Sequence, residues 1–280
     1  MKVIDVEAME WAPVPVNTRS MKLSRKLLRE DEILPEIRYS NFIIRFEGGD
    51  DVFTTPRHRH EFAQLRYTLK GSQDFGDGLI APEGWVGFFP VGAYYGPQRT
   101  EDSQTFQVQW GRDWVTVEQT EQGIAKLTSE GGVFDKGIYS YADADGRVHR
   151  KDAVNAVWEA VYGRELVIPE PEYPMAILMN PDAFEWQSYK PGMSIKRLGE
   201  FSGAGVAVQI LRWDEPGEHR LAAGRTEMAL CREGTIEVDS IAYGENAVVW
   251  SDLDEDVVIK GEAGSEILLY LFPKAAAEER

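Results

Sequence analysis

Two of the four histidines in this 280-residue chain lie within three residues of each other, in the segment Thr55-Pro-Arg-His-Arg-His60. In an extended chain, side chains two positions apart point to the same face, so we expect His58 and His60 to converge. Arg57 and Arg59 should then point the other way. Two converging imidazoles make half of a metal site, which would suit iron, nickel, copper or zinc. The same pattern also fits an ordinary surface strand that alternates histidine with arginine.

The elements that would position this pair are short strands. Runs rich in β-branched and aromatic residues recur between turns of Gly, Pro, Asp and Asn. The predicted strands cover residues 41–46, 62–69, 84–89, 105–110, 206–213, 227–231, 235–239, 247–250, 256–260 and 267–272. Helical periodicity is strong in 151–163, and a shorter helix is predicted for 20–29. So many short strands favour an all-β sandwich or barrel over an α/β fold.

The chain also contains one internal repeat. Residues 41–71 and 204–234 share the same order of an apolar strand, an acidic turn, a second strand and a glycine turn. In this alignment Gln64 corresponds to Glu227, whereas His58 and His60 correspond to leucine and alanine. The repeat predicts two β-barrels, and any metal should lie in the N-terminal one.

Four segments follow from this reading. We expect an N-terminal arm (1–37), an N-terminal barrel that holds the site (38–115), a connector with one helix (116–195) and a C-terminal barrel without a metal motif (196–280). Within the connector, residues 166–174 are rich in proline, so this piece should run extended across a barrel or a subunit interface.

The residues around the histidine pair resemble the two conserved motifs of the cupin superfamily. The first motif there is His-x-His, a glutamate and a glycine, and the second is glycine, Pro-x-Gly and a histidine. The matching positions in this chain are His58, His60, Gln64, Gly71, Gly84, Pro90, Gly92 and Tyr95. Together with the repeat, the chain resembles a bicupin, which implies two jelly-roll (double-stranded β-helix) barrels and a homodimer.

Two positions depart from the cupin pattern, because Gln64 replaces the glutamate and Tyr95 replaces the last histidine. A glutamine oxygen can bind a metal but brings no negative charge. The resemblance implies a divalent metal held by His58, His60, Gln64 and Tyr95, with iron expected first and nickel, manganese or zinc as alternatives. Tyr95 could instead be a proton donor beside a three-ligand open site. A metal-free site with acid–base or hydrogen-bonding roles for these side chains is the remaining alternative.

The alternation of side chains along a strand adds one candidate site residue and argues against another. Arg66 shares a face with Gln64 on the predicted strand, so it could point into the barrel and clamp a substrate carboxylate. Glu61 has the opposite parity and is expected to be exposed. In the second copy, His219 is isolated and is expected at the surface. The single cysteine, Cys231, lies in an apolar run and should be a buried, inert thiol.

Composition narrows the classes of partner. The formal charge is −17, and no basic stripe is interleaved with aromatic residues, so neither nucleic acid nor an anionic membrane is expected as a partner. The sequence has no long apolar run and no secretory leader pattern, so we expect a cytoplasmic protein that acts on a small molecule.

The leading functional hypothesis is a metal-dependent cupin enzyme for a small organic molecule, with dioxygenase-type chemistry on an aromatic or enol-type substrate. Arg66 would hold the substrate anion, and Tyr95 would act as ligand or proton donor. The same residues could run an isomerase or lyase reaction by moving a proton. A non-catalytic bicupin that binds a small molecule is the alternative from a different class.

Overall fold

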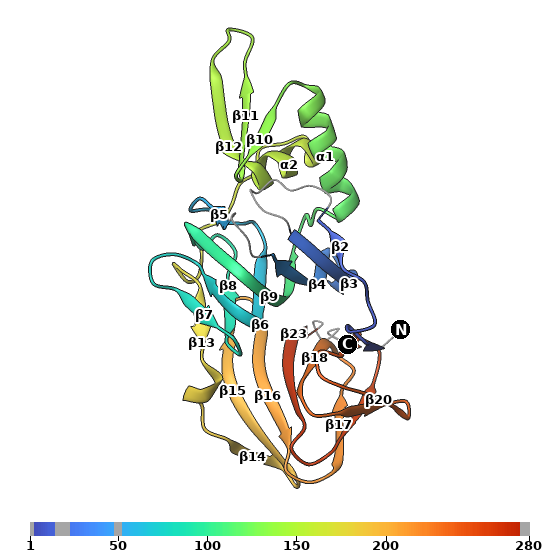
Figure 1. Cartoon of the computed structure of the whole chain (residues 1–280). Helices are drawn as coiled ribbons and strands as arrows, with labels where there is room; N and C mark the ends of the chain where they lie inside the picture. The colour runs from blue at the N-terminus through green and yellow to red at the C-terminus, as the bar shows by residue number, and fades with distance from the viewer. Residues whose placement is uncertain (1–2, 15–22, 48–51, 275–280) are drawn as a thin grey trace. The chain divides into compact units, whose positions relative to one another are not determined.

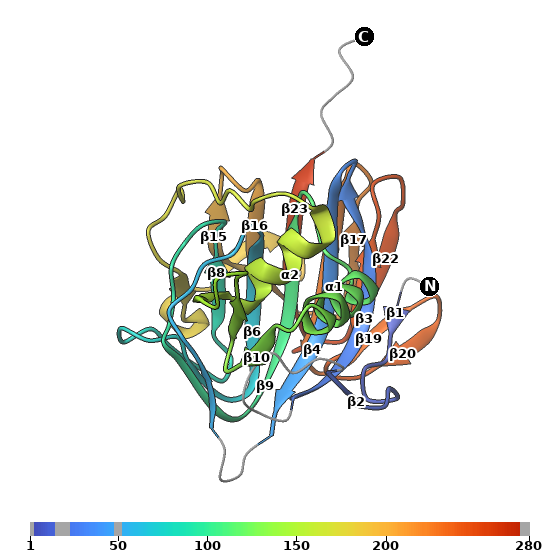
Figure 2. The same ribbon diagram turned by 90° about the horizontal axis from the view of Figure 1, so that it is seen from above.

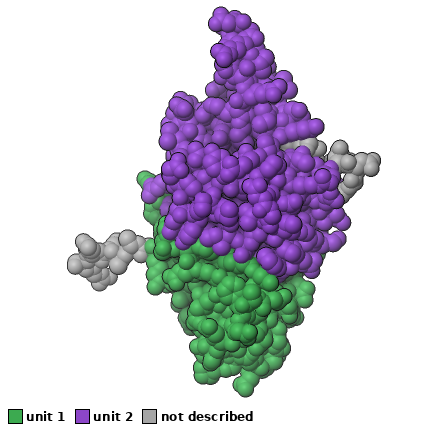
Figure 3. Space-filling view, turned by 90° about the vertical axis from the view of Figure 1, so that its left-hand side faces the viewer, with its two compact units in different colours: residues 1–10, 32–36, 179–280 green, residues 11–31, 37–178 purple. Residues whose placement is uncertain are grey.

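A computed structural model describes residues 3–14, 23–47 and 52–274. These residues form two compact units, drawn in green and purple in Figure 3. Unit 1 contains residues 1–10, 32–36 and 179–280, and unit 2 contains residues 11–31 and 37–178. No helix in the described part of the chain is long and apolar enough to cross a membrane.

Unit 2 is built around one large antiparallel sheet (Figure 1). Its strand order is β13-β8-β6-β9-β4-β3-β2, with β5 paired to β9 and β7 paired to β6. The strands are β2 (Ala12–Pro13), β3 (Leu23–Leu34), β4 (Ile37–Phe46), β5 (Phe53–Thr55), β6 (Ala63–Asp74), β7 (Ile80–Pro82), β8 (Val86–Phe89), β9 (Gln98–Gly111) and β13 (Ile177–Met179). The long strands β6 and β9 pair along most of their length, and β6 also pairs with β8. The residues of β6, which follow the histidine pair in the sequence, are therefore held between two neighbouring strands.

Unit 1 contains a seven-stranded sheet, β1-β21-β18-β23-β16-β15-β14, and a four-stranded sheet, β17-β22-β19-β20. The first sheet uses β1 (Val3–Ile4), β14 (Gln187–Lys190), β15 (Met193–Phe201), β16 (Val206–Trp213), β18 (Arg225–Glu233), β21 (Val248–Ser251) and β23 (Glu266–Lys274). The second uses β17 (Gly217–Leu221), β19 (Ile236–Val238), β20 (Ile241–Tyr243) and β22 (Val257–Gly261). The all-β prediction is therefore confirmed, and each predicted strand overlaps an observed one.

The sheet orders also bear out the internal repeat. The order β8-β6-β9-β4-β3 in unit 2 has the same pattern as β21-β18-β23-β16-β15 in unit 1. Gly71, near the end of β6, and Gly234, directly after β18, both have a φ of 75°, a backbone conformation that glycine adopts without strain. The two copies thus share one topology despite their low sequence identity.

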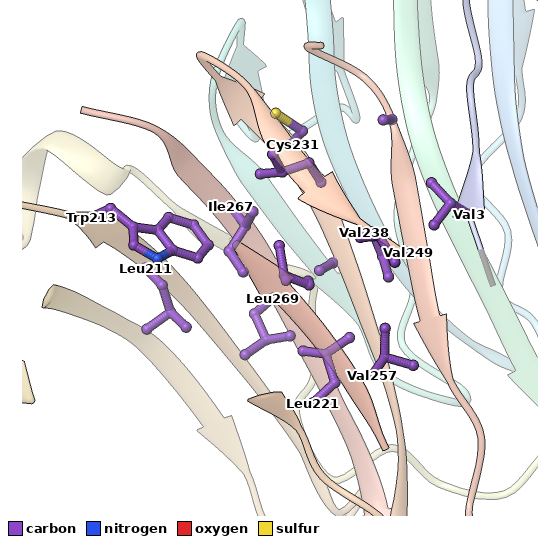
Figure 4. Close-up of a cluster of buried hydrophobic side chains, with 14 of the residues drawn as sticks. Val3, Leu211, Trp213, Leu221, Cys231, Val238, Val249, Val257, Ile267 and Leu269 are labelled. Atoms are coloured by element: carbon purple, nitrogen blue, oxygen red, sulfur yellow. The ribbon is translucent and has the colours of Figure 1, made fainter. Parts of the chain in front are cut away.

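The interiors of the two copies differ in chemistry. Unit 1 is filled by an apolar cluster that includes Leu211, Leu221, Val249 and Leu269 (Figure 4). Unit 2 instead buries polar side chains on its central strands, namely Gln64, Arg66, Thr68, Thr100, Thr105 and Gln107. Because buried polar groups cost free energy unless they are paired, a polar interior indicates a binding site rather than a structural core.

The connector holds more structure than the sequence predicts. The predicted helix is present as α2 (Ala153–Tyr162), which Asp152 caps at its N-terminus and which ends at Gly163 with a φ of 65°. A second helix, α1 (Val117–Ser129), begins with a capping box formed by Thr116 and Gln119. Strands β10 (Val133–Asp135), β11 (Ile138–Ala142) and β12 (Val148–Asp152), a short 3₁₀ helix, η1 (Pro181–Ala183), and the strands β13 and β14 also lie in this region.

The helices α1 and α2 pack against each other and lie over one end of the unit 2 strands, as both views show (Figures 1 and 2). The expected N-terminal arm is not a separate element, because β1, β2 and β3 join the sheets. The helix predicted for 20–29 is wrong for residues 23–29, which belong to β3, and residues 20–22 lie outside the described part. Alternating burial along β3 explains this, since a period of two fits a strand.

Candidate active site

Backbone contacts bring the two predicted motifs together in unit 2. His58 and Tyr95 form an isolated antiparallel bridge, with His58 N donating to the Tyr95 carbonyl at 3.0 Å and Tyr95 N donating to the His58 carbonyl at 3.1 Å. Gly92 N donates to the His60 carbonyl at 2.9 Å. A β-carbon on Gly92 would lie 2.3 Å from the Pro169 carbonyl oxygen, so the proline-rich segment crosses here and requires glycine.

The two histidines converge as the spacing predicts. His58 and His60 are 5% and 6% exposed, and their ring centroids lie 4.9 Å apart. Arg57 and Arg59 point elsewhere, since both guanidinium groups stack on the ring of Tyr94 at 4.6 and 4.9 Å. The alternation within this short segment is therefore confirmed.

The hydroxyl of Tyr95 lies at the centre of a buried hydrogen-bond network. His60 Nε2 is 3.1 Å from this oxygen, Gln64 Nε2 is 3.2 Å from it and Arg66 Nη2 is 2.9 Å from it. Gln64 and Arg66 can only donate through these atoms, so the tyrosine oxygen accepts both bonds. Its own proton is then available to His60 Nε2, which makes that nitrogen the acceptor and places the imidazole proton on Nδ1.

The orientation of the Gln64 amide follows from its neighbours. Its Oε1 accepts from Arg66 Nε at 3.1 Å, from Arg66 Nη2 at 2.7 Å and from Gln109 Nε2 at 2.9 Å. Because these three partners are donors, the oxygen must face them and the nitrogen must face Tyr95. Arg66 thus points into the barrel, in agreement with its parity, and its guanidinium also lies over the ring of Phe89 at 4.7 Å.

His58 is fixed by the backbone. Its Nδ1 lies 2.7 Å from the Pro56 carbonyl oxygen, which can only accept, so Nδ1 carries the proton and Nε2 carries the lone pair. A histidine that ligates a metal is held in the same way, by donating its other nitrogen to a backbone carbonyl. The ring also packs on Tyr95, with a centroid distance of 4.4 Å.

The four predicted metal ligands do not fit a divalent ion as a set. Gln64 Oε1 already accepts three hydrogen bonds, and the Tyr95 oxygen accepts one from a guanidinium. None of the four brings a carboxylate, so an ion bound here would add its charge to the buried cation of Arg66. Within the described residues, no group of three His, Cys, Asp or Glu side chains is placed to hold a metal.

A cavity of about 300 Å³ opens onto this network inside unit 2. Its polar lining consists of Ser40, Thr55, His58, His60, Glu61, Arg66, Tyr95, Gln98, Gln107, Gln109 and Thr120, with Arg25, Glu30 and Glu121 among the charged residues. Its apolar lining includes Phe42, Ile44, Phe46, Phe53, Phe62, Trp114, Val154, Val157 and Trp158. The helices α1 and α2 contribute part of this wall, so the connector forms part of the candidate active site.

Glu61 is the residue that sequence reasoning missed. It lines the cavity, whereas the sequence pattern predicts that it is exposed. Burial raises the pKa of its carboxyl to about 7; a hydrogen bond from its own backbone amide lowers this pKa, and the nearby charge of Asp152 raises it. The parity argument failed because residues 61 and 62 form a bend, so the alternation that holds up to His60 does not continue into β6. No feature of the sequence marked Glu61 for this position.

Two predictions concern unit 1. His219 is not at the surface but lies buried on β17 with 6% exposure, and burial lowers the pKa of its imidazole to about 4. The sequence pattern treats this histidine as isolated, whereas in the structure it pairs with Ile259 of β22 and its ring centroid lies 6.0 Å from that of Tyr189. Cys231 is buried as predicted, and burial raises the pKa of its thiol to about 12, so the thiol is inert.

Comparison with known proteins identifies the fold. No protein-family model and no curated protein sequence matches the chain. A proposed dioxygenase from Nostoc punctiforme superposes with a TM-score of 0.63 at 12% identity, covering 99% of this chain and 84% of that one. Escherichia coli YlbA gives a TM-score of 0.56 at 8% identity, with coverage of 99% and 92%.

Bacillus subtilis oxalate decarboxylase, a structure studied for its Mn(II) centres, gives a TM-score of 0.52 at 13% identity, covering 99% of this chain and 78% of that one. These neighbours are cupin-fold proteins, and the decarboxylase is a bicupin. The chain therefore has the cupin fold in its two-barrel form. At such identities the likeness establishes the fold and leaves the chemistry to the residues of this chain.

Proposed function

We propose that the N-terminal barrel is the active site of an enzyme that moves a proton on a small organic anion, in an isomerase or lyase reaction. The observation that carries this proposal is the Tyr95 hydroxyl, which is bonded to His60, Gln64 and Arg66 beside the cavity. The C-terminal barrel takes no part, because its interior is filled by apolar side chains.

The network holds the Tyr95 hydroxyl in place for a proton transfer to His60. Passing the phenolic proton to His60 Nε2 creates a phenolate and an imidazolium 3.1 Å apart. Arg66 and Gln64 already donate to the oxygen that would carry the negative charge, and such donors stabilise the charged form. The phenolate can then remove a proton from carbon next to a substrate carbonyl.

The remaining steps balance without an oxidant. Removal of the C–H proton leaves the electron pair on the substrate as an enolate, and Tyr95 is neutral again. Return of a proton to a different atom gives an isomer, whereas loss of a leaving group from the adjacent carbon gives a lyase product. Arg66 supplies the positive charge for the substrate anion, and aromatic walls such as Phe62 and Trp114 exclude water.

A metal-dependent oxygenase, predicted from the sequence, is the second candidate. One observation favours it, namely the bond from His58 Nδ1 to the Pro56 carbonyl, which leaves Nε2 oriented like that of a metal ligand. The occupied Gln64 oxygen and the buried Arg66 argue against it.

Loss of C–H signal in D₂O tests the proposal. The purified protein is incubated with a panel of 2-oxo acids, 1,3-diketones and hydroxy acids, and exchange is followed by proton NMR. We expect Tyr95→Phe to slow exchange by about 10²- to 10⁴-fold, the usual contribution of a general acid–base group. Tyr94→Phe is the matched control, because this neighbouring ring is 39% exposed. Equal rates in Tyr95→Phe and the wild type would overturn the assignment.

A further inference from the structure

The wall of the cavity changes from charged to apolar across the sheet of unit 2. Arg66 on β6 pairs with Gln107 on β9, and Gln107 pairs on its other side with Phe42 on β4. Residues directly opposite each other in a ladder point to the same face of the sheet, and all three side chains line the cavity. Two strand spacings, about 10 Å, therefore separate the backbones of Arg66 and Phe42.

The apolar part of the wall continues along β4 and onto the helices. Ile44, two residues after Phe42, lines the same cavity and is only partly buried. Phe42 itself keeps 9% of its surface exposed, so a ligand in the cavity can touch both side chains. Val117 of α1 and Val154 of α2 add further apolar lining.

The size of the cavity shows that the anion-binding end is only one part of it. The volume of about 300 Å³ falls at the lower end of the range for pockets that enclose a drug-sized ligand. A three-carbon oxo acid bound to Arg66 would leave water in contact with Phe42 and Ile44. Because the removal of apolar surface from water is favourable, an apolar substituent on the acid would strengthen binding.

We infer that the substrate is an amphipathic oxo acid, whose carboxylate binds Arg66 and whose alkyl or aryl substituent lies against Phe42 and Ile44. This inference deepens the proposed function and rests on it for the position of the reactive carbonyl beside Tyr95. The apolar wall selects among oxo acids by the length of the substituent, whereas Arg66 and Tyr95 contact the part that all of them share.

Three compounds test the two ends of the ligand separately by titration calorimetry. 2-Oxohexanoate has two more methylene groups than 2-oxobutanoate, and hexan-2-one carries a methyl group in place of the carboxylate of 2-oxohexanoate. We expect 2-oxohexanoate to bind at least 10-fold more tightly than 2-oxobutanoate, because each buried methylene is worth about 4-fold. Hexan-2-one should bind at least 10-fold more weakly than 2-oxohexanoate, because it cannot bond the guanidinium as an anion.

Variants of the apolar wall assign the preference to these side chains. Phe42→Gln places an amide on the wall and should reduce the preference for the longer acid to less than 3-fold. Ile44→Thr is a smaller change, which serves if Phe42→Gln fails to fold, and should lower the preference by at least 2-fold. Ile80→Thr is the matched control and should keep it, because Ile80 on β7 is 48% exposed and is not among the residues that line the cavity.

The variant Tyr95→Phe separates this inference from the proposed function. The preference for 2-oxohexanoate should persist in Tyr95→Phe even though proton exchange is lost. A wild type that shows the preference but no exchange would sink the proposed function and leave the apolar subsite standing. Equal affinity for the two acids, no binding of either, equal affinity for hexan-2-one and 2-oxohexanoate, or an unchanged preference in a folded wall variant would overturn the inference.

Discussion

Replacing Gln64 by glutamate restores the residue type that the cupin motif has at this position, and we expect this change to lower the rate of proton exchange. In the structure Gln64 Nε2 donates to the Tyr95 oxygen at 3.2 Å. Gln64→Glu replaces this donor with a carboxylate oxygen, which can only accept. Tyr95 would then donate its proton to the carboxylate instead of to His60, and the phenolate would lie against a second anion.

The magnitude follows from these contacts. A lost hydrogen bond to a charged group costs about 1.5–3 kcal/mol. Two unit charges at this separation repel by about 5 kcal/mol at an effective dielectric constant of about 20, and the adjacent guanidinium of Arg66 offsets part of that. We therefore expect the barrier to rise by about 3–5 kcal/mol, a fall of about 10²- to 10⁴-fold in kcat.

The assay is the proton-exchange rate of Gln64→Glu beside Gln64→Leu, with metal content measured on the same samples. Gln64→Leu removes the same donor without adding charge, so it should lose less activity than Gln64→Glu. A glutamate variant that binds metal stoichiometrically and gains activity would refute the reasoning, because it would mean that the site is a metal centre lacking only its acidic ligand.

Two further predictions concern stability. Burial raises the pKa of Glu227 to about 7, so the folded wild type loses stability as the pH rises and this carboxyl ionises. Glu227→Gln has no such group, so its free energy of unfolding relative to the wild type should increase by about 2–3 kcal/mol between pH 5 and pH 8.5, as measured by urea unfolding. A gain that is larger at pH 5 would contradict this sign. Gly92→Ala combines a φ of 78° with a clash against the Pro169 carbonyl, and should lower the free energy of unfolding by about 2–4 kcal/mol. A change under 0.5 kcal/mol would show that the two segments are not in contact.

The sequence predicted the strands and the histidine pair because both depend on local alternation. Arg66 was placed correctly for the same reason, since it lies inside the regular strand β6. Glu61 could not be placed, because the bend at residues 61 and 62 ends the alternation that positions the histidine pair. The helix α1 was missed although its capping box, Thr116 to Gln119, is visible in the sequence.

The chemistry of the site depended on contacts between distant positions. Motif spacing put Gln64 and Tyr95 near the histidines, but it could not show that Arg66 and Gln109 would occupy the Gln64 oxygen. Nor could it show that the connector helices would line the cavity, because the packing of α1 and α2 over the strands of unit 2 depends on contacts between segments far apart in the sequence.

The most direct test of the central claim is the exchange rate of the wild-type protein before and after removal of metal by a chelator, with metal content measured in each sample. If Tyr95 and His60 move the proton, the rate is the same in both samples and is lost in Tyr95→Phe. A rate that falls in proportion to the metal removed, and returns when iron or manganese is added back, would contradict the account.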